Sequence, residues 1–359
     1  MTKKILVVDD SALMRRVLCD IIESDIRYKV VARANNGLEA FDLLSRNQYD
    51  AVVLDVNMPK MNGLQLLQEL RKYKIPARVL MASTDTMEGA KTTLDALELG
   101  ALDFIHKPDS AFDCRVDSFK NDLLRILDVV VNSKFPVYES TEREQISKQT
   151  ASKMTDIARK FSAKIPGTKI VAIASSTGGP RALQSVIPRL PAELDAPVLL
   201  VQHMPKGFTA SLAERLDQLS AIHVKEAAEG DEIQKGTVYI AKGGQHMNVT
   251  DIGGRCVIHY TDEPNREGVK PCANYMFESL TDCRYDMVIG VVMTGMGADG
   301  TDGIKNLKAK KKMHVISQDQ ESSTVYGMPR AIAAAGLTDQ IVPLEQIAQE
   351  IILNVGVRG

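Results

Sequence analysis

Five short apolar runs, each followed by a stretch with helical periodicity, constrain the fold of the first 132 residues more than any other feature. The runs are rich in β-branched residues, and the stretches between them repeat apolar side chains at three- and four-residue steps. Strands that alternate with helices predict a parallel sheet with helices on both faces. We therefore expect a doubly wound α/β domain. The five runs span residues 5–8, 30–34, 51–54, 78–82 and 104–105.

A second α/β series begins near residue 169. Its run at residues 287–293 is apolar almost throughout, which is typical of a central strand covered on both faces. Since 359 residues exceed the size at which one core usually keeps growing, we expect a second, Rossmann-like domain. The segment between the series is polar, as linkers are. The expected domains are residues 1–131 and 168–359 with a linker at 132–167, and further strands are expected at 170–174, 198–201, 238–241, 256–260, 287–293 and 315–317.

The composition excludes several classes of function. Hydrophobic residues make up 44%, charged residues 25%, and the formal net charge is -2, so the chain has no overall attraction to nucleic acid or an acidic membrane. Five widely spaced cysteines without a CxxC pair argue against a disulfide framework and a zinc site. No apolar run reaches membrane-spanning length, and the N-terminal run is too short for a signal peptide. We expect a cytoplasmic protein whose partners are proteins or small molecules.

Three carboxylates stand at strand ends in the first series. Asp9 and Asp10 follow the first run and Asp55 follows the third, and such strand ends meet at one crevice of a doubly wound sheet. Crowded carboxylates need a neutralising cation, and their hard oxygen ligands suit Mg²⁺. Ser83 and Lys107, after the fourth and fifth runs, add a hydroxyl and a positive charge that suit a phosphoryl group. Asp9 and Asp10 alone could equally cap a helix, but the five residues together predict a metal and phosphate site.

These residues resemble the receiver domain of two-component response regulators. The matching stretches are Val-Val-Asp-Asp at residues 7–10, Asp-Val-Asn-Met-Pro-Lys-Met-Asn-Gly at 55–63 and Lys-Pro at 107–108. The resemblance implies a flavodoxin-like fold, and a chemotaxis histidine kinase as the phosphodonor. The implied roles are phosphoacceptor for Asp55, Mg²⁺ ligand for Asp9, Asp10 and Asp55, phosphate sensor for Ser83 and Lys107, and aromatic switch for Phe104.

The turn after the expected strand at residues 170–174 suggests a nucleophile. Its sequence at residues 175–180, Ser-Ser-Thr-Gly-Gly-Pro, consists mostly of small residues and leads into a helix. A strand, a tight turn and a helix N-terminus place a hydroxyl beside unpaired N–H groups that favour developing negative charge. The turn lacks the Gly-x-Ser-x-Gly elbow of the α/β-hydrolases, so by itself it fits phosphate binding or helix capping as well.

Two further strand ends complete a hydrolytic arrangement with Ser176. The strand at residues 198–201 leads to His203, and the run at residues 287–293 leads to Asp299. A histidine can take the serine proton, and a carboxylate behind it can hold the ring in one tautomer and stabilise the imidazolium. His246, which follows Gly-Gly-Gln, is a rival base. We prefer His203 because a long strand positions it rigidly.

Most of residues 169–344 resemble the catalytic domain of chemotaxis protein-glutamate methylesterases, and with the receiver the whole chain resembles the CheB family. Four stretches match in order, at residues 175–180, 202–205, 293–300 and 327–330. The resemblance implies hydrolysis of glutamate methyl esters, and deamidation of glutamines, on the cytoplasmic domains of methyl-accepting chemoreceptors, with no cofactor for hydrolysis. Because one chain carries both a phosphate switch and a hydrolytic site, we also expect the receiver to cover the active site until Asp55 is phosphorylated. The implied site residues are Ser176 as nucleophile, His203 as base, Asp299 as orienting acid, the Met296 backbone N–H as oxyanion donor, and Thr177 and His246 beside them.

Three positions depart from the family pattern. Cys272 and Asn274 stand where the family commonly has serine and aspartate, and Lys242 replaces a frequent proline. Because all three lie outside the proposed triad, we expect them to affect substrate fit or local packing more than the chemistry.

Two rival interpretations of the second domain stay open. Gly295, Gly297 and Gly300 fit the Gly-x-Gly-x-x-Gly turn of dinucleotide-binding domains, with Asp319 after the next strand. Against this, the charge of Asp299 inside that turn would oppose a pyrophosphate. The other rival is a DNA-binding output domain, which should be small, basic and built around a recognition helix, unlike this large α/β half.

Overall fold

The computed structural model describes residues 2–83, 87–108, 117–135 and 167–358. The chain divides into two compact units, Met1–Ser140 and Thr141–Gly359, and each is described by itself. Most of the expected linker at residues 132–167 lies outside the described residues. In the described part of the chain, no helix is long and apolar enough to cross a membrane.

The first unit contains a five-stranded parallel sheet in the order β2-β1-β3-β4-β5. The strand order reverses between β1 and β3, so their carboxyl ends open onto one crevice. The doubly wound fold expected from the five apolar runs is confirmed. The strands are β1 Lys3–Val8, β2 Tyr28–Ala34, β3 Ala51–Asp55, β4 Val79–Ser83 and β5 Asp103–His106.

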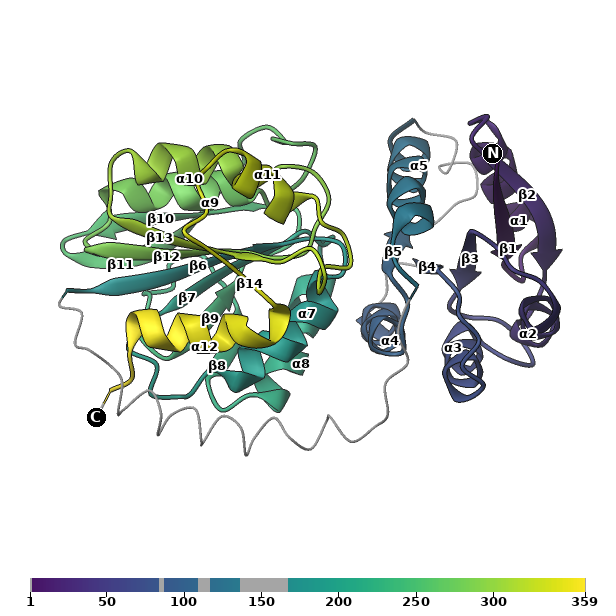
Figure 1. Ribbon diagram of the computed structural model, residues 1–359, viewed down its shortest axis with the longest axis horizontal. Coiled ribbons are helices and arrows are strands. Elements are labelled where there is room, and N and C mark those ends of the chain that lie inside the picture. Colours follow the sequence, from purple (N-terminus) through teal and green to yellow (C-terminus); the bar gives the residue numbers. More distant parts are fainter. Residues whose placement is uncertain (1, 84–86, 109–116, 136–166, 359) are drawn as a thin grey trace. The chain divides into compact units, whose positions relative to one another are not determined.

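Helices cover both faces of this sheet, with α1 and α5 on one face and α2, α3 and α4 on the other (Figure 1). Ser11, Asn36 and Asn62 each accept a hydrogen bond from the backbone N–H three residues further on. These caps satisfy donors that a first helical turn leaves open, which is why α1, α2 and α3 begin where they do. The helices are α1 Ala12–Glu23, α2 Gly37–Arg46, α3 Gly63–Lys72, α4 Met87–Glu98 and α5 Asp117–Asn132.

The second unit is built on a seven-stranded sheet in the order β14-β13-β12-β6-β7-β9-β8, in which every neighbouring pair is parallel. The apolar run that predicts a central strand is β12, which lies between β13 and β6 and is almost wholly buried. The second doubly wound domain is thereby confirmed. The strands are β6 Lys169–Ser175, β7 Val198–Gln202, β8 His223–Glu226, β9 Thr237–Ile240, β12 Met287–Val292, β13 Met313–Gln318 and β14 Gln340–Val342.

Helices also cover both faces of the second sheet: α7, α8 and α12 lie on one face and α9, α10 and α11 on the other (Figure 1). The core beneath α9 and α10 includes Phe277, Ile304 and Leu307, all fully buried. This layer of α9 and α10 supports the loops described below. The helices are α7 Gly179–Val186, α8 Phe208–Leu219, α9 Ala273–Ser279, α10 Thr301–Lys308, α11 Met328–Ala334 and α12 Leu344–Val355.

A separate antiparallel hairpin, β10 (His246–Ile252) and β11 (Arg255–Thr261), lies next to α9. The sequence predicts β11 but not its partner β10, nor the short strands β8 and β14. Ile252 pairs with Arg255, so the connection is the two residues Gly253 and Gly254, both with positive φ (+60° and +80°). Glycine adopts this conformation without strain, and it suits the tight turns of two-residue hairpins.

Candidate active site

Three neighbouring strands bring the candidate hydrolytic residues to one edge of the second sheet. β12, β6 and β7 are adjacent and parallel, so the loops that follow them leave at the same carboxyl edge. Ser176 follows β6, His203 follows β7, and Asp299 lies in the loop after β12. Backbone hydrogen bonds join these loops: Ser176 N–H donates to the Thr294 carbonyl at 3.0 Å, and His203 N–H donates to the Ser175 carbonyl at 3.1 Å. The fold therefore brings together three segments that are distant in the chain.

Ser176 lies in a tight turn between β6 and α7 and is half-buried. Gly178 in this turn has a φ of +77°, and a Cβ there would lie 2.6 Å from the Thr324 side chain, so the position requires glycine. Gln202 braces the turn from β7. Its Oε1 accepts from the Ser175 hydroxyl at 2.7 Å, and its Nε2 donates to the Ser176 carbonyl at 2.9 Å. Sequence reasoning missed this role, although Gln202 lies in one of the matching stretches.

The His203 ring contacts the Asp299 carboxylate directly. Its Nε2 lies 2.7 Å from Asp299 Oδ2, and the two side chains are only 9% and 1% exposed. Because Nε2 faces the carboxylate, Nδ1 is the ring nitrogen left to receive a proton, the reverse of the serine-protease arrangement. Within the described residues the Ser176 hydroxyl makes no hydrogen bond, to His203 or otherwise. Such contacts often tighten only when substrate is bound.

Donors surround the buried Asp299 carboxylate. Oδ2 accepts from Ala273 N–H at 2.6 Å, and Oδ1 accepts from the N–H groups of Asn274 (3.0 Å) and Gly300 (2.8 Å). The Cys272 thiol lies 3.0 Å from the same Oδ1. Burial alone would raise the pKa of Asp299, but the His203 ring and these donors outweigh it and leave the pKa below its ordinary value. The carboxylate therefore stays ionised at neutral pH and can stabilise a protonated His203.

Cys272 and Asn274, which depart from the family pattern, lie against this carboxylate. Besides the contact of Cys272, the Asn274 side-chain oxygen accepts from Gly300 N–H at 3.1 Å and Gly303 N–H at 2.7 Å. It thereby ties the first turn of α9 to the start of α10. Both positions therefore support the loop that carries Asp299.

His246, the rival base, contacts the loop of Cys272. Its ring is fully buried, its Nδ1 accepts from Cys272 N–H at 3.2 Å, and it packs on the Tyr275 ring with centroids 4.7 Å apart. Burial lowers the pKa of His246, so the ring is neutral and Nδ1 can accept. Among the described contacts none joins His246 to Ser176. The geometry favours a supporting position for His246 over that of the base.

The loop after β12 packs closely on Ser176. A Cβ on Gly295 would lie 2.7 Å from Ser176 Cβ, so only glycine permits this approach. The backbone N–H of Met296, the next residue, makes no hydrogen bond within the described residues. Thr177 is 7% exposed, and its carbonyl accepts from the Thr294 hydroxyl at 3.0 Å. A free N–H beside the serine loop is what an oxyanion hole requires.

The same loop counts against a dinucleotide site. Gly300 N–H, which a bound pyrophosphate would need, donates to the side chains of Asp299 and Asn274. Asp319, the expected ribose ligand, accepts from the N–H and hydroxyl of Ser322 in its own loop. The glycine turn is therefore occupied by the chain's own carboxylate.

In the first unit, the predicted acidic cluster forms at the carboxyl ends of β1 and β3. Asp9, Asp10 and Asp55 each offer a carboxylate oxygen, and these oxygens all lie within 4.8 Å of one another. Lys107 Nζ lies 2.6 Å from Asp55 Oδ1 and 3.1 Å from Asp9 Oδ2, with all three residues buried. Burial raises the pKa of Asp9 and of Asp55, and the attraction of Lys107 only partly offsets it. A single lysine leaves three carboxylates undercompensated, so the donor set fits a divalent cation.

The other residues predicted for this site lie at the same edge. Ser83 ends β4 and is 1% exposed, and Lys107 N–H donates to its carbonyl at 2.7 Å. Phe104, in β5, is buried. Gly63 at the start of α3 approaches so closely that a Cβ would lie 2.3 Å from the Asp55 carbonyl oxygen. The helix therefore packs directly on the strand end that carries the candidate phosphoacceptor.

Comparisons with known proteins find a match for each half of the chain. The response regulator receiver domain model matches residues 5–113, and the CheB methylesterase model matches residues 171–351. A relative from Geobacillus kaustophilus is 42% identical over 356 residues, or 99% of each chain, and one from Pyrococcus abyssi is 43% identical over 98% of this chain and 93% of its own. Both are named protein-glutamate methylesterase/protein-glutamine glutaminase. The CheB methylesterase catalytic domain of Thermotoga maritima is 39% identical with a TM-score of 0.51, covering 53% of this chain and 100% of that domain.

The chain carries a receiver domain followed by a doubly wound domain, and one edge of the second sheet brings together a serine, a histidine and an aspartate. This combination defines a response regulator with an enzymatic output. Within that class, the chain belongs to the CheB methylesterase family.

Proposed function

We propose that this chain is a phosphorylation-activated serine hydrolase that cleaves glutamate methyl esters, and deamidates glutamines, on the cytoplasmic domains of methyl-accepting chemoreceptors. The observation that carries the hydrolytic part is the 2.7 Å contact between His203 and Asp299 at the strand edge shared with Ser176. The relatives that match nearly the whole chain carry this activity in their names. The proposed location is the cytoplasm.

The first half of the reaction forms an acyl-enzyme. The Ser176 hydroxyl attacks the γ-carbonyl carbon of the methylated glutamate while His203 Nδ1 takes its proton. Asp299 stabilises the imidazolium through Nε2–H. The Met296 N–H donates to the oxyanion that develops on the carbonyl oxygen. His203 then returns the proton to the departing methoxide, which leaves as methanol.

The second half releases the product. His203 deprotonates a water, which attacks the acyl carbon, and the Ser176 oxygen leaves with the proton that His203 held. The product is a free glutamate carboxylate. A glutamine substrate follows the same course with ammonia as the leaving group. Nucleophile, base and oxyanion donor all come from the chain, so the proposed hydrolysis uses no cofactor.

The receiver half is proposed to accept a phosphoryl group from a chemotaxis histidine kinase on Asp55. Asp10 and Asp55, helped by Asp9, would hold Mg²⁺, which neutralises charge on the phosphoryl oxygens during transfer. Lys107, which now pairs with Asp55 and Asp9, would turn to the phosphoryl oxygens, and Ser83 would donate its hydroxyl to them. The support is the acidic cluster with its buried lysine.

Control of one half by the other completes the proposal. We propose a receiver at residues 1–131, a linker at 132–167 and a catalytic domain at 168–359, with the unphosphorylated receiver covering the active site. Phosphorylation then shifts the population toward an open arrangement. Phe104 is proposed to couple the phosphate to that change.

Methanol release from methylated receptor membranes tests the function, measured with and without a small phosphodonor. We expect release that the phosphodonor raises, no release above background from Ser176→Ala, and no phosphodonor effect in Asp55→Ala. Unchanged release by Ser176→Ala would remove the proposed nucleophile. A constitutively full rate in Asp55→Ala, with no phosphodonor, would contradict the coupling.

A further inference from the structure

One of the side chains that contact the Asp299 carboxylate has no assigned role. Asp299 receives three backbone N–H donors and His203, and among the described residues the thiol of Cys272, 3.0 Å from Oδ1, is the other side chain bonded to it. Cys272 is fully buried and directly precedes α9. Burial and the neighbouring Asp299 raise the pKa of this thiol far above its usual range. The thiol therefore stays protonated, is inert as a nucleophile, and can donate its S–H to the carboxylate.

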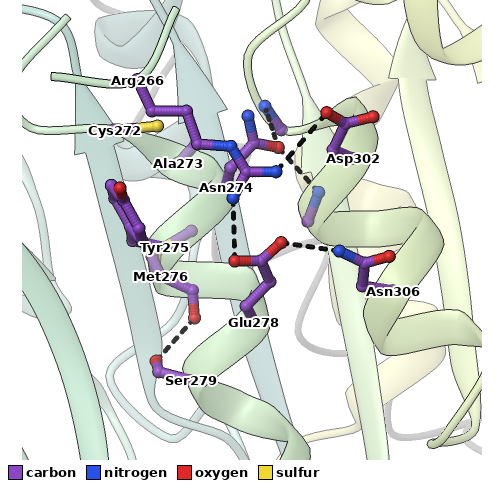
Figure 2. A network of polar contacts seen from close by, with 12 residues as sticks. Arg266, Cys272, Ala273, Asn274, Tyr275, Met276, Glu278, Ser279, Asp302 and Asn306 are labelled. Atoms are coloured by element: carbon purple, nitrogen blue, oxygen red, sulfur yellow. Dashed lines mark hydrogen bonds and ion pairs between the residues drawn. The ribbon is translucent and has the colours of Figure 1, made fainter. Parts of the chain in front are cut away.

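Contacts from four directions fix Cys272 in place. His246 accepts its backbone N–H at 3.2 Å, and the next two residues donate their N–H groups to Asp299. Asn274 anchors the following turn through Gly300 and Gly303. Figure 2 shows how the preceding loop is held: Arg266 reaches Glu278 of α9 at 2.8 Å and Asp302 of α10 at 3.4 Å.

We infer that Cys272 is a positioning residue of the hydrolytic site, whose S–H group fixes the orientation and basicity of the Asp299 carboxylate behind His203. This rests on the proposed function of Ser176, His203 and Asp299. His203 bonds Oδ2 beside the Ala273 N–H, whereas the thiol bonds Oδ1 beside the N–H groups of Asn274 and Gly300. The thiol is therefore one of three donors to the end of the carboxylate that lies opposite the ring. A carboxylate held at both ends cannot rotate away from the ring, and its charge is shared between the donors.

The inferred role predicts the direction of a shift in the pH profile, which a merely structural role would not. Without the thiol, more of the negative charge on Asp299 would act on His203 and stabilise its protonated form. We therefore expect the acidic limb of the kcat/KM profile to move to higher pH. Of the other charged groups nearby, Arg266 of the β11–α9 loop acts on the Cys272 thiol and itself pairs with Glu278 of α9 and Asp302 of α10. Lys270 and Glu263 act on His246, which holds the Cys272 backbone.

The test compares Cys272→Ala, which removes the donor, with Cys272→Ser, which keeps one. Methanol release by the full-length protein is measured across pH 5–9 in the presence of phosphodonor. For Cys272→Ala we expect kcat/KM to fall about 3- to 10-fold, since one modest hydrogen bond is lost, and the acidic limb to shift up by about half a unit. Cys272→Ser should restore both. Cys256→Ala, a buried cysteine of β11 outside the triad contacts, serves as the control and should leave the limb unmoved.

The outcomes separate this inference from the proposed function. A wild-type protein that releases no methanol ends the proposed function itself. A wild-type protein that is active, with Cys272→Ala and wild type sharing one acidic limb, overturns the inference alone. If Cys272→Ala is poorly folded by circular dichroism, the serine variant decides: an acidic limb displaced from that of wild type, with the protein folded, contradicts the donor role.

Discussion

Two buried carboxylate sites, one in each half of the chain, lie at the same kind of place and differ in their electrostatics. Asp55 ends β3 and Asp9 follows β1 of the first sheet, and Asp299 lies in the loop after β12 of the second. All three are at most 6% exposed. Yet burial raises the pKa of Asp9 and Asp55, whereas the donors around Asp299 lower its pKa.

The difference comes from what each site offers a negative charge. Asp299 receives backbone N–H groups, a thiol and the His203 ring, while Asp9 and Asp55 share one lysine and have Asp10 beside them. The first arrangement is complete without any further partner. The second is undercompensated and gains from a cation. A site that must keep one charge state has enough hydrogen-bond donors within the chain. A site whose charge state must change has too few donors and cations for its carboxylates.

The largest expected effect separates the hydrolytic site from the receiver site. Ser176→Ala should lower kcat by at least about 10³-fold, because the nucleophile is lost, while phosphorylation of Asp55 by a small phosphodonor stays unchanged. Methanol release and phosphodonor consumption measure the two. The matched control is Ser175→Ala, whose hydroxyl donates to Gln202 and which should keep activity within about 10-fold. A reversed order of the two serines would break the assignment.

The next effect concerns Asp299, the carboxylate whose donors all come from the chain. Asp299→Asn should lower kcat about 10²- to 10⁴-fold with little change in KM, because an amide neither stabilises the His203 imidazolium nor accepts all the surrounding donors. Steady-state methanol release measures it. Asp302→Asn, in the first turn of α10, is the control, since the contact described for the Asp302 side chain is a long ion pair with Arg266 at 3.4 Å. Equal losses in the two variants would mean that the region acts through packing alone.

The receiver site, where one lysine faces three carboxylates, should respond to mutation with a change in stability. In metal-free buffer, Lys107→Ala leaves Asp9 and Asp55 without their cation and should destabilise the receiver by about 3–5 kcal/mol. Urea unfolding, monitored by hydrogen exchange at the β1 and β3 amides, measures this loss of stability. Lys29→Ala, which breaks an exposed pair with Glu23, should cost under about 1 kcal/mol. Mg²⁺ should recover part of the loss in Lys107→Ala, and a variant as stable as wild type without Mg²⁺ would contradict the account.

The smallest effect is an opposite response of the two halves to pH. The pKa of Asp299 is depressed in the fold, so its stabilisation is present above the unfolded value and is lost only as pH falls below about 4. The pKa values of Asp9 and Asp55 are raised, so their ionisation costs stability that returns as pH falls toward about 4. As pH falls from 7 toward about 4, we expect the β1 and β3 amides to gain protection and the β12 amides to gain none.

Hydrogen exchange of the full chain in metal-free buffer, corrected for the intrinsic rates, measures that response. Saturating Mg²⁺ is the control, because a bound cation keeps the carboxylates ionised and should abolish the gain in β1 and β3. Parallel changes in both halves would show that the contrast between the sites does not govern their stability.

The strands that carry the sites could be predicted because each signal is local. The apolar runs before Asp9, Asp55 and His203 are short and bounded by turn residues, so their periodicity alone marks them. The hairpin strand β10 escaped because its mixed pattern is stabilised by pairing with β11. His246, considered from the sequence as a rival base, is buried at the start of this unpredicted strand.

By itself, the sequence determined that two doubly wound domains form and which side chains end their strands, because periodicity and turn residues act within a few positions. Only the tertiary structure decided that Nε2 of His203 faces Asp299, that Gln202 braces the turn of Ser176, and that Cys272 bonds the carboxylate. Those contacts join residues 26 to 96 positions apart, and their geometry depends on strand order and loop packing. No local pattern encodes either.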